Sequence, residues 1–184
     1  MEDILKHKTA VVYGAGSIGG AVAAAFAKAG ATVFVADHHE DALKKLADKN
    51  IQTERLDVLD KDAVAAFVKS VVEKTGHVDI SFCATSTVEA MLRLLAAELG
   101  PYGVRTVCLH SAGSEGAADK TLAYTNPELE KRTEGWGQRW MSRNLLGRGP
   151  TLEEVGNMAA FMASDLAGAT TGTTVSLTAG MVNH

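Results

Sequence analysis

The sequence predicts an α/β fold built on a doubly wound parallel sheet of about six strands, with helices on both faces. Three observations lead to this fold class. Short apolar runs rich in β-branched residues alternate with stretches of helical periodicity along the chain. The links between most of these segments are short, as is typical of βα and αβ connections. The first expected strand also runs directly into a glycine-rich turn, Gly14-x-Gly16-x-x-Gly19, which an Ala-rich segment follows.

The expected strands are apolar runs that turn residues or helical segments separate. They lie at residues 8–13, 32–36, 51–56, 78–83, 103–110 and 173–178. Right-handed crossovers between parallel strands then give the expected sheet order 3-2-1-4-5-6.

The expected helices lie at residues 17–29, 40–49, 60–75, 87–99 and 151–163. In 60–75 and 87–99 the apolar residues recur every three or four positions, which predicts one buried face on each helix. The helix at 151–163 follows Pro150 and opens with Thr151 and Glu154, the pattern of a capping box.

One domain over residues 1–184 is expected, with an excursion at about 111–150. This segment contains six glycines and both tryptophans and has no strand pattern. A loop of this length is usually functional, and some helix is expected in it around 126–143. Trp136 and Trp140 are four residues apart and are expected to pack that helix onto the domain.

Composition limits the function classes. The chain has 184 residues, 46% of them hydrophobic, and a net charge of −4, which disfavours nucleic acid and anionic membranes as partners. The apolar runs are too short for a membrane span, and the N-terminal residues do not resemble a secretory signal, so a cytoplasmic location is expected. Cys83 and Cys108 lie in apolar runs and are expected to be buried free thiols. His38 and His39 are expected to point apart on an extended segment, so no metal site is predicted.

The glycine motif predicts a phosphate-binding turn. Gly14 permits the tight turn, Gly16 allows the backbone to approach a pyrophosphate, and Gly19 allows the helix to pack closely on the strand. Ser17 and Ile18 lie between them at the start of the helix, where free N–H groups and the helix dipole favour an anion. Together with the strand before the motif and the helix after it, the pattern predicts a Rossmann-like dinucleotide site.

An acidic residue ends the second expected strand. Asp37 lies 18 residues after Gly19 and is placed to accept hydrogen bonds from a ribose hydroxyl. A carboxylate at this position repels a 2′-phosphate, and His38 and His39 compensate less than an arginine would. NAD is therefore expected rather than NADP.

With these motifs in place, the chain resembles a short-chain dehydrogenase/reductase over essentially its whole length. The matching stretches are YGAGSIGGAVA (13–23), the Asp-Val pair at 57–58, GHVDISF (76–82), VEAMLRLLAAELGPYGVRTVCL (88–109) and GRGPTLEEVGNMAAFMASDLAGATTGTTVSLTAG (147–180). The resemblance implies that Asp57 and Val58 contact the adenine, although turn chemistry alone would make Asp57 a strand-end cap. It also places Ala84 and Ser111 beside the cofactor, at the ends of two strands.

The catalytic residues of that family are missing from this sequence. Its members carry a catalytic Ser and a Tyr-x-x-x-Lys motif, in a helix, a strand and the start of a helix that have no counterpart between residues 83 and 88. No tyrosine here is followed by lysine four residues later. No catalytic residue is therefore assigned. Ser86 is expected to cap the helix at 87–99, and His110 to be an ordinary strand-end histidine.

Several alternatives follow from this loss. The protein is expected to be an NAD(H)-binding oxidoreductase that acts on a small molecule and has impaired activity. The alternatives are a non-catalytic dinucleotide-binding sensor or partner subunit, and hydrolysis through Ser86 or Ser111, which no Gly-x-Ser-x-Gly elbow supports. A homo-oligomer is expected from the resemblance. The join at 84–87 is either a true deletion or a place where the natural chain continues through further residues.

Overall fold

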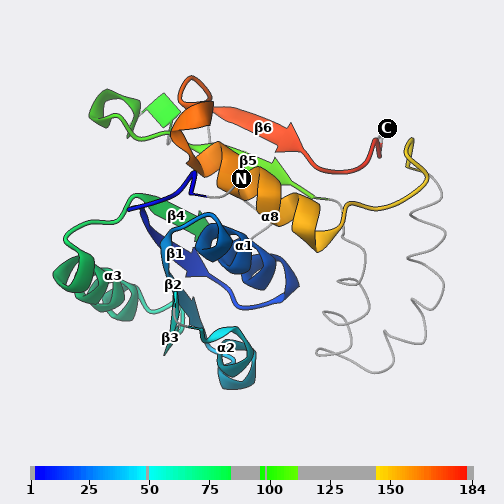
Figure 1. Ribbon diagram of the computed structural model, residues 1–184. Coiled ribbons are helices and arrows are strands. Elements are labelled where there is room, and N and C mark those ends of the chain that lie inside the picture. Colours follow the sequence, from blue (N-terminus) through cyan, green and yellow to red (C-terminus); the bar gives the residue numbers. More distant parts are fainter. Residues whose placement is uncertain (1–2, 49, 84–95, 98, 112–143, 182–184) are drawn as a thin grey trace. The chain divides into compact units, whose positions relative to one another are not determined.

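The structure is a computed structural model that describes residues 3–48, 50–83, 96–97, 99–111 and 144–181 (Figure 1). It divides into two compact units. The first comprises Met1–Thr85 with Gly156–Gly168, and the second comprises Ser86–Val155 with Ala169–His184. The single domain expected over 1–184 stays a prediction.

The first unit contains a four-stranded parallel sheet. Its strands are β1 (Thr9–Tyr13), β2 (Thr32–Asp37), β3 (Ile51–Arg55) and β4 (Ile80–Cys83), in the order β3-β2-β1-β4. This confirms the expected order of the first four strands.

The second unit contains a two-stranded parallel sheet, β5 (Val107–His110) paired with β6 (Thr173–Ser176). The expected adjacency of the last two strands is confirmed. The joining of all six strands into one sheet stays a prediction.

Four α-helices are described: α1 (Ser17–Lys28), α2 (Glu40–Leu46), α3 (Lys61–Thr75) and α8 (Leu152–Ala163). Figure 1 shows α1 and α2 on one face of the four-stranded sheet and α3 on the other, as expected for a doubly wound fold. Among the described residues, none of the helices has the length and apolar character needed to cross a membrane.

The alternation of side chains along β1 and β2 creates two buried faces. Val11 of β1 is in register with Phe34 of β2, and these two pack with Phe67 and Val71 of α3. Because neighbouring residues of a strand point to opposite faces, Val12 faces the other side, the side of α1. Apolar residues on both faces of the strands are the expected pattern for a parallel sheet covered by helices.

Small and aromatic residues pack on the face of the sheet that α1 covers. Val22 and Phe26 of α1 are completely or almost completely buried, and the Phe26 ring lies edge-on to Phe82 of β4, with 6.5 Å between the ring centroids. At Gly156 of α8, an added Cβ would lie 2.9 Å from the carbonyl oxygen of Ala21. α8 therefore packs closely on α1 because a glycine lies at the contact.

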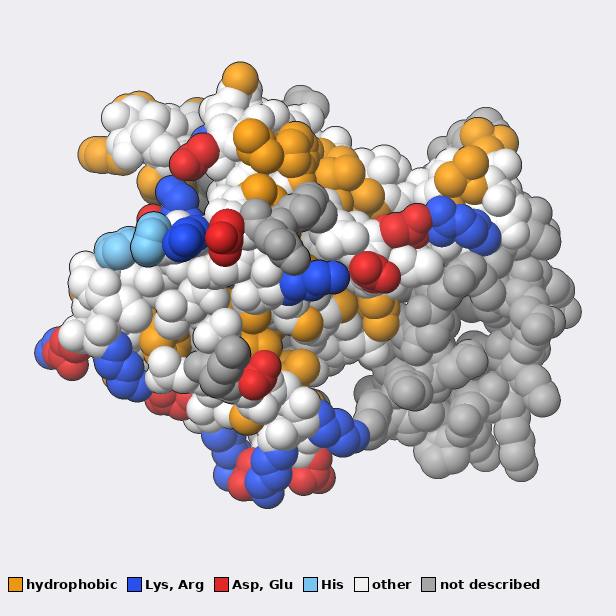
Figure 2. Space-filling model, viewed as in Figure 1, with side chains coloured by type: hydrophobic (Ala, Val, Ile, Leu, Met, Phe, Trp, Pro, Cys, Tyr) orange, Lys and Arg blue, Asp and Glu red, His pale blue; other side chains and the backbone are white. Residues whose placement is uncertain are grey.

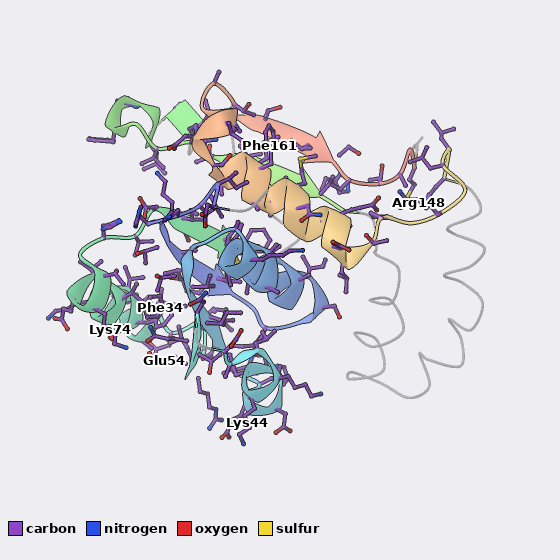
Figure 3. The ribbon with its side chains drawn as sticks, in the orientation of Figure 1. Phe34, Lys44, Glu54, Lys74, Arg148 and Phe161 are labelled. Carbon is purple, nitrogen blue, oxygen red and sulfur yellow. The ribbon has the colours of Figure 1, made fainter. Side chains whose placement is uncertain are left out.

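The surface of the first unit is charged. Figure 2 shows side chains of both signs over α2, where Lys44 pairs with Glu40 at 3.1 Å. In Figure 3, Lys74 of α3 lies near Phe34 of β2, with its ammonium 5.7 Å from the ring centroid. Such a contact covers the edge of the core while the charge stays in water.

Element ends differ from the expected ones where local geometry intervenes. The fifth strand begins at Val107 rather than 103, because Gly100–Tyr102 forms a 3-10 turn that Gly103 ends with a φ of 75°. The expected helices at 87–99 and 126–143, with Trp136 and Trp140, lie almost entirely outside the described residues.

The prediction of two buried thiols is wrong. Cys83 is exposed and Cys108 is only partly buried, although both are free of disulfide bonds as expected. Cys83 is the last residue of β4, and an apolar run does not guarantee burial at the end of a strand.

Replacing Gly19 by alanine should destabilise the first unit. The added Cβ would lie 1.9 Å from the backbone oxygen of Gly14, so the turn or the helix must shift. We expect the free energy of unfolding to fall by roughly 1–3 kcal/mol, despite the better helix propensity of alanine. Urea unfolding followed by circular dichroism measures this loss.

Gly16→Ala is the matched control, because a Cβ at Gly16 has nothing within 4 Å. Its cost should stay below about 1 kcal/mol, the penalty for alanine as a poorer N-cap. Equal losses in the two variants would contradict the role given to Gly19.

Candidate functional site

The glycine turn joins β1 to α1 and is shaped by two of its three glycines. Gly14 has a φ of 105°, which side-chain-bearing residues rarely adopt, and its N–H donates to the carbonyl of Ala36 on β2 at 2.9 Å. Gly19 lies against the carbonyl oxygen of Gly14, where no Cβ fits. The turn is therefore fixed from both ends, by the strand before it and the helix after it.

Gly16 is different, because the protein itself does not require a glycine there. Its φ is −66°, which any residue adopts, and a Cβ would meet no atom within 4 Å. Open space beside the backbone at the centre of the turn is what a closely approaching ligand needs.

The N-terminus of α1 has no compensating negative charge from its own residues. Gly16, its N-cap, makes no side-chain hydrogen bond, and the first turn contains no acidic residue. By contrast, Asp60 caps α3 through the amides of Asp62 and Ala63, and the first turn of α8 contains two glutamates. The amides of Ser17, Ile18 and Gly19 have no acceptor within the helix, so this end of α1 suits an external anion.

Asp37, the last residue of β2, is tied to the glycine turn. Its Oδ2 accepts a hydrogen bond of 2.6 Å from the amide of Ala15, and its Oδ1 accepts one of 2.8 Å from the amide of His39. Only 12% of the side chain is exposed. Burial by itself would raise the pKa of this carboxyl, but the hydrogen bonds from Ala15 and His39 and the nearby His38 outweigh it. The pKa of Asp37 is therefore lowered, and the group is an anion at neutral pH.

The two histidines after Asp37 do not point apart, so that expectation is wrong. Their ring centroids are 3.6 Å apart, and each Nδ1 lies 3.2 Å from Oδ1 of Asp37. The strand ends at Asp37, and His38 is in a bend before α2. The side-chain alternation of an extended segment therefore no longer applies. The one feature of the sequence that could have indicated this cluster is the run of Asp37, His38 and His39 itself.

Asp57 and Val58 follow β3 and lie at the same edge of the sheet as Asp37. The amide of Leu56 donates to the carbonyl of Asp37 at 2.9 Å, and Oδ1 of Asp57 accepts from the amide of Leu59 at 2.9 Å. This is the turn-capping role that local chemistry predicts for Asp57. Val58 is 49% exposed. The adenine contacts of both residues stay predictions.

The remaining sequence-predicted positions lie either outside the described residues or in the second unit. Ala84 and Ser86 lie outside the described residues. His110 is the last residue of β5 in the second unit, and its carbonyl accepts from the amide of Leu177 at 2.7 Å. Ser111 follows it in the same unit. The cofactor contact expected of Ser111 stays a prediction.

The capping box before α8 is confirmed, with an addition that the sequence did not predict. Oγ1 of Thr151 accepts from the amide of Glu154 at 3.1 Å, and Oε2 of Glu154 accepts from the amide of Thr151 at 2.9 Å. Arg148 also donates to both carboxylate oxygens of Glu154, at 2.8 and 2.6 Å. The pKa of Glu154 is lowered to about 2, first by the hydrogen bonds from Arg148 and then by that from the amide of Thr151.

Comparison with known proteins agrees with this fold and turn. The family model described as enoyl-(acyl carrier protein) reductase matches residues 14–88 and 82–182. These two matches cover most of the chain, and the fold is that of Rossmann-like α/β proteins. The chain therefore belongs to the short-chain dehydrogenase/reductase family.

Three curated relatives illustrate the similarity. An uncharacterized oxidoreductase, YxbG, of Bacillus subtilis is 38% identical over 85 residues, 42% of this chain and 31% of that protein. The enoyl-[acyl-carrier-protein] reductase [NADH] FabI of Haemophilus influenzae is 37% identical over 97 residues, 53% of this chain and 34% of that protein. The glycine betaine reductase ATRR of Emericella nidulans is 42% identical over 83 residues, 41% of this chain and 6% of that protein. The matches thus span about a third of the first two relatives and far less of the third.

Replacing Asp37 by asparagine should destabilise the protein in a pH-dependent way. Asparagine has one acceptor oxygen, so the amide of Ala15 or that of His39 loses its partner, at a cost of about 1–3 kcal/mol. Because the pKa of Asp37 is lowered by folding, its stabilisation is fully present above the ordinary value of 3.8 and is lost as the pH falls through the lower folded value.

The difference between wild type and Asp37→Asn should therefore be constant above about pH 5 and shrink below the ordinary carboxyl pKa. Urea unfolding at several pH values measures it. Glu54→Gln, on the exposed part of β3, is the control for a lost charge alone. A difference that grows as the pH falls would contradict the assigned hydrogen bonds.

Proposed function

We propose that the protein is an NAD(H)-binding oxidoreductase of the short-chain dehydrogenase/reductase family, whose ability to turn over substrate is impaired in this chain. The observation that carries the proposal is the uncapped N-terminus of α1, which lies beside an open glycine turn and an ionised Asp37. This combination offers donors to a pyrophosphate and an acceptor to a ribose within one turn of the backbone.

Each residue of the turn has a distinct part in the proposed binding. Gly14 and Gly19 shape the turn, and Gly16 leaves room for the pyrophosphate beside the amides of Ser17 and Ile18. Asp37 accepts from the adenosine ribose. Asp57 and Val58, at the end of the adjacent strand, contact the adenine, and Ala84 and Ser111 lie at the nicotinamide end.

The charge of Asp37 favours NAD over NADP. An ionised carboxylate repels a 2′-phosphate, and the lowered pKa of Asp37 keeps it ionised at neutral pH. The Haemophilus relative, an enoyl-[acyl-carrier-protein] reductase [NADH], supports the same preference. His38 and His39, which lie beside Asp37, are the groups that would weaken this preference for NAD.

The bound cofactor would supply a hydride to, or take one from, a carbonyl or alcohol carbon. The chain must in turn exchange a proton with the substrate oxygen, which the tyrosine of Tyr-x-x-x-Lys does in this family. The sequence has no such motif. The two family matches meet at residues 82–88, and this supports the proposal that the catalytic segment is absent between them.

The proposed oxidoreductase is favoured over a non-catalytic sensor because the relatives named above are oxidoreductases. A small-molecule substrate, a cytoplasmic location and a homo-oligomer belong to the same proposal. They are supported by family membership, by the net charge of −4, and by the absence of a membrane-spanning helix among the described residues.

Titration calorimetry with NADH and NADPH tests the binding site. We expect NADH to bind more tightly than NADPH, because only the latter carries a phosphate toward Asp37. Gly16→Ala should weaken NADH binding about 5–150-fold, the equivalent of roughly 1–3 kcal/mol for a Cβ forced into a close contact. Its own folding should change little, since the Cβ meets no protein atom.

Equal or tighter binding of NADPH would overturn the role of Asp37, and the absence of binding by either nucleotide would overturn the site. A Gly16→Ala variant that binds NADH like wild type would show that no ligand approaches the turn at this glycine.

Turnover should be absent, or slower than in active family members by about 10²–10⁴-fold for the lost proton transfer alone. NADH oxidation with simple aldehydes and ketones measures it by absorbance. The intact mass is compared with 19.3 kDa, and peptide mapping of a heavier protein tells whether extra residues lie between 83 and 88. Turnover that His110→Ala abolishes and Ser86→Ala preserves would contradict this expectation and identify His110 as the proton donor.

A further inference from the structure

We propose that Asp37, His38 and His39 form a binding site for a divalent transition-metal ion of the Zn²⁺ type, at the end of β2. The three residues offer one carboxylate oxygen and two imidazole nitrogens, and these ligand atoms all lie within 4.8 Å of one another. Carboxylate and imidazole together suit Zn²⁺ and its neighbours in the first transition series.

The two distances between a histidine and Asp37 fit a tetrahedral ion. Nδ1 of His38 and Nδ1 of His39 are each 3.2 Å from Oδ1 of Asp37. Bonds of about 2.0–2.1 Å in a tetrahedral Zn²⁺ complex separate neighbouring ligand atoms by roughly 3.3–3.4 Å. These two pairs are therefore close to the spacing that one shared ion requires, and the ligand atoms of the two imidazoles lie within 4.8 Å of each other.

The carboxylate is oriented before any ion binds. The amide of Ala15 fixes Oδ2 at 2.6 Å, and the amide of His39 contacts Oδ1 at 2.8 Å. Hydrogen bonds of this kind behind a ligand hold its orientation and contribute to metal affinity. The histidine side chains are 67% and 64% exposed, so a fourth position is open to solvent.

A second histidine–aspartate pair in the chain has only two potential ligands and can be compared with this cluster of three. Nε2 of His77 lies 3.0 Å from Oδ2 of Asp79, and the same oxygen accepts from the amide of Thr9 at 2.7 Å. Among the described residues, only the cluster at Asp37 brings together three ligand atoms of this kind. His77 is therefore the natural control.

Binding of the ion should exclude the dinucleotide, an extension that rests on the proposed function. Oδ1 of Asp37 would be shared between the ion and the adenosine ribose, and Oδ2 already accepts from Ala15. Oδ1 cannot coordinate the ion and accept a full hydrogen bond from the ribose at the same time. Zn²⁺ and NADH are then expected to compete.

Direct titration with Zn²⁺ alone tests the metal site. Competition against a chromophoric chelator gives the affinity, and Co²⁺ in place of Zn²⁺ reports the coordination geometry through its visible spectrum. We expect His38→Ala and His39→Ala each to weaken Zn²⁺ binding by at least about 10–100-fold, the loss typical for even an outer-shell partner of a ligand. Both side chains are exposed, so the variants should fold.

His77→Ala should leave the affinity unchanged. An unchanged affinity in the double variant His38→Ala/His39→Ala, or an equal loss in His77→Ala, would overturn the site. An octahedral Co²⁺ spectrum would overturn the tetrahedral arrangement.

The competition is tested by titrating NADH with and without saturating Zn²⁺. The apparent Kd for NADH should rise with Zn²⁺ in the wild type and should not respond in the double variant. If Zn²⁺ binds without changing the apparent Kd for NADH, the proposed competition is overturned, but the metal site stands. Failure of NADH to bind at all would overturn the proposed function, while the direct titration still decides on the metal.

Discussion

The contact between Gly19 and the carbonyl oxygen of Gly14 determines where the first helix begins. An added Cβ would lie 1.9 Å from that oxygen, so α1 approaches the end of β1 more closely than any other residue would allow. This close approach brings the free amides at the start of α1 to the carboxyl edge of the sheet. The open space at Gly16 and the bond from Gly14 to β2 both depend on the same tight turn.

Asp37 connects this turn to the next strand. Its carboxylate accepts from the amide of Ala15 in the turn and from that of His39 before α2, so one partly buried anion orders two loops. The same hydrogen bonds lower its pKa and orient it. A residue that would select the cofactor is thus also a structural residue, and substitutions at Asp37 affect folding and binding together.

The predicted elements match the described structure best where the chain has a strong local pattern. The parallel strands around the first sheet, the helix at 60–75 and the capping box at Thr151 and Glu154 all follow from patterns of a few neighbouring residues. Two of the wrong predictions fall where a pattern ends. Cys83 is exposed at the last position of its strand, and His38 and His39 come together because the chain bends immediately after β2.

The sequence by itself determined the α/β class, the order of the first four strands and the glycine turn, because these depend on hydrophobic periodicity and on residues that tolerate only one local geometry. Only the tertiary structure decided what Asp37 binds and how the two imidazoles lie against it. Those contacts join the last residue of β2 to the loops that follow β1 and β2, and the distance to Ala15 depends on how the two strands are placed side by side. The pKa of Asp37 is lowered in part by the amide of Ala15, which lies 22 residues away in the sequence and which only folding brings to the carboxylate.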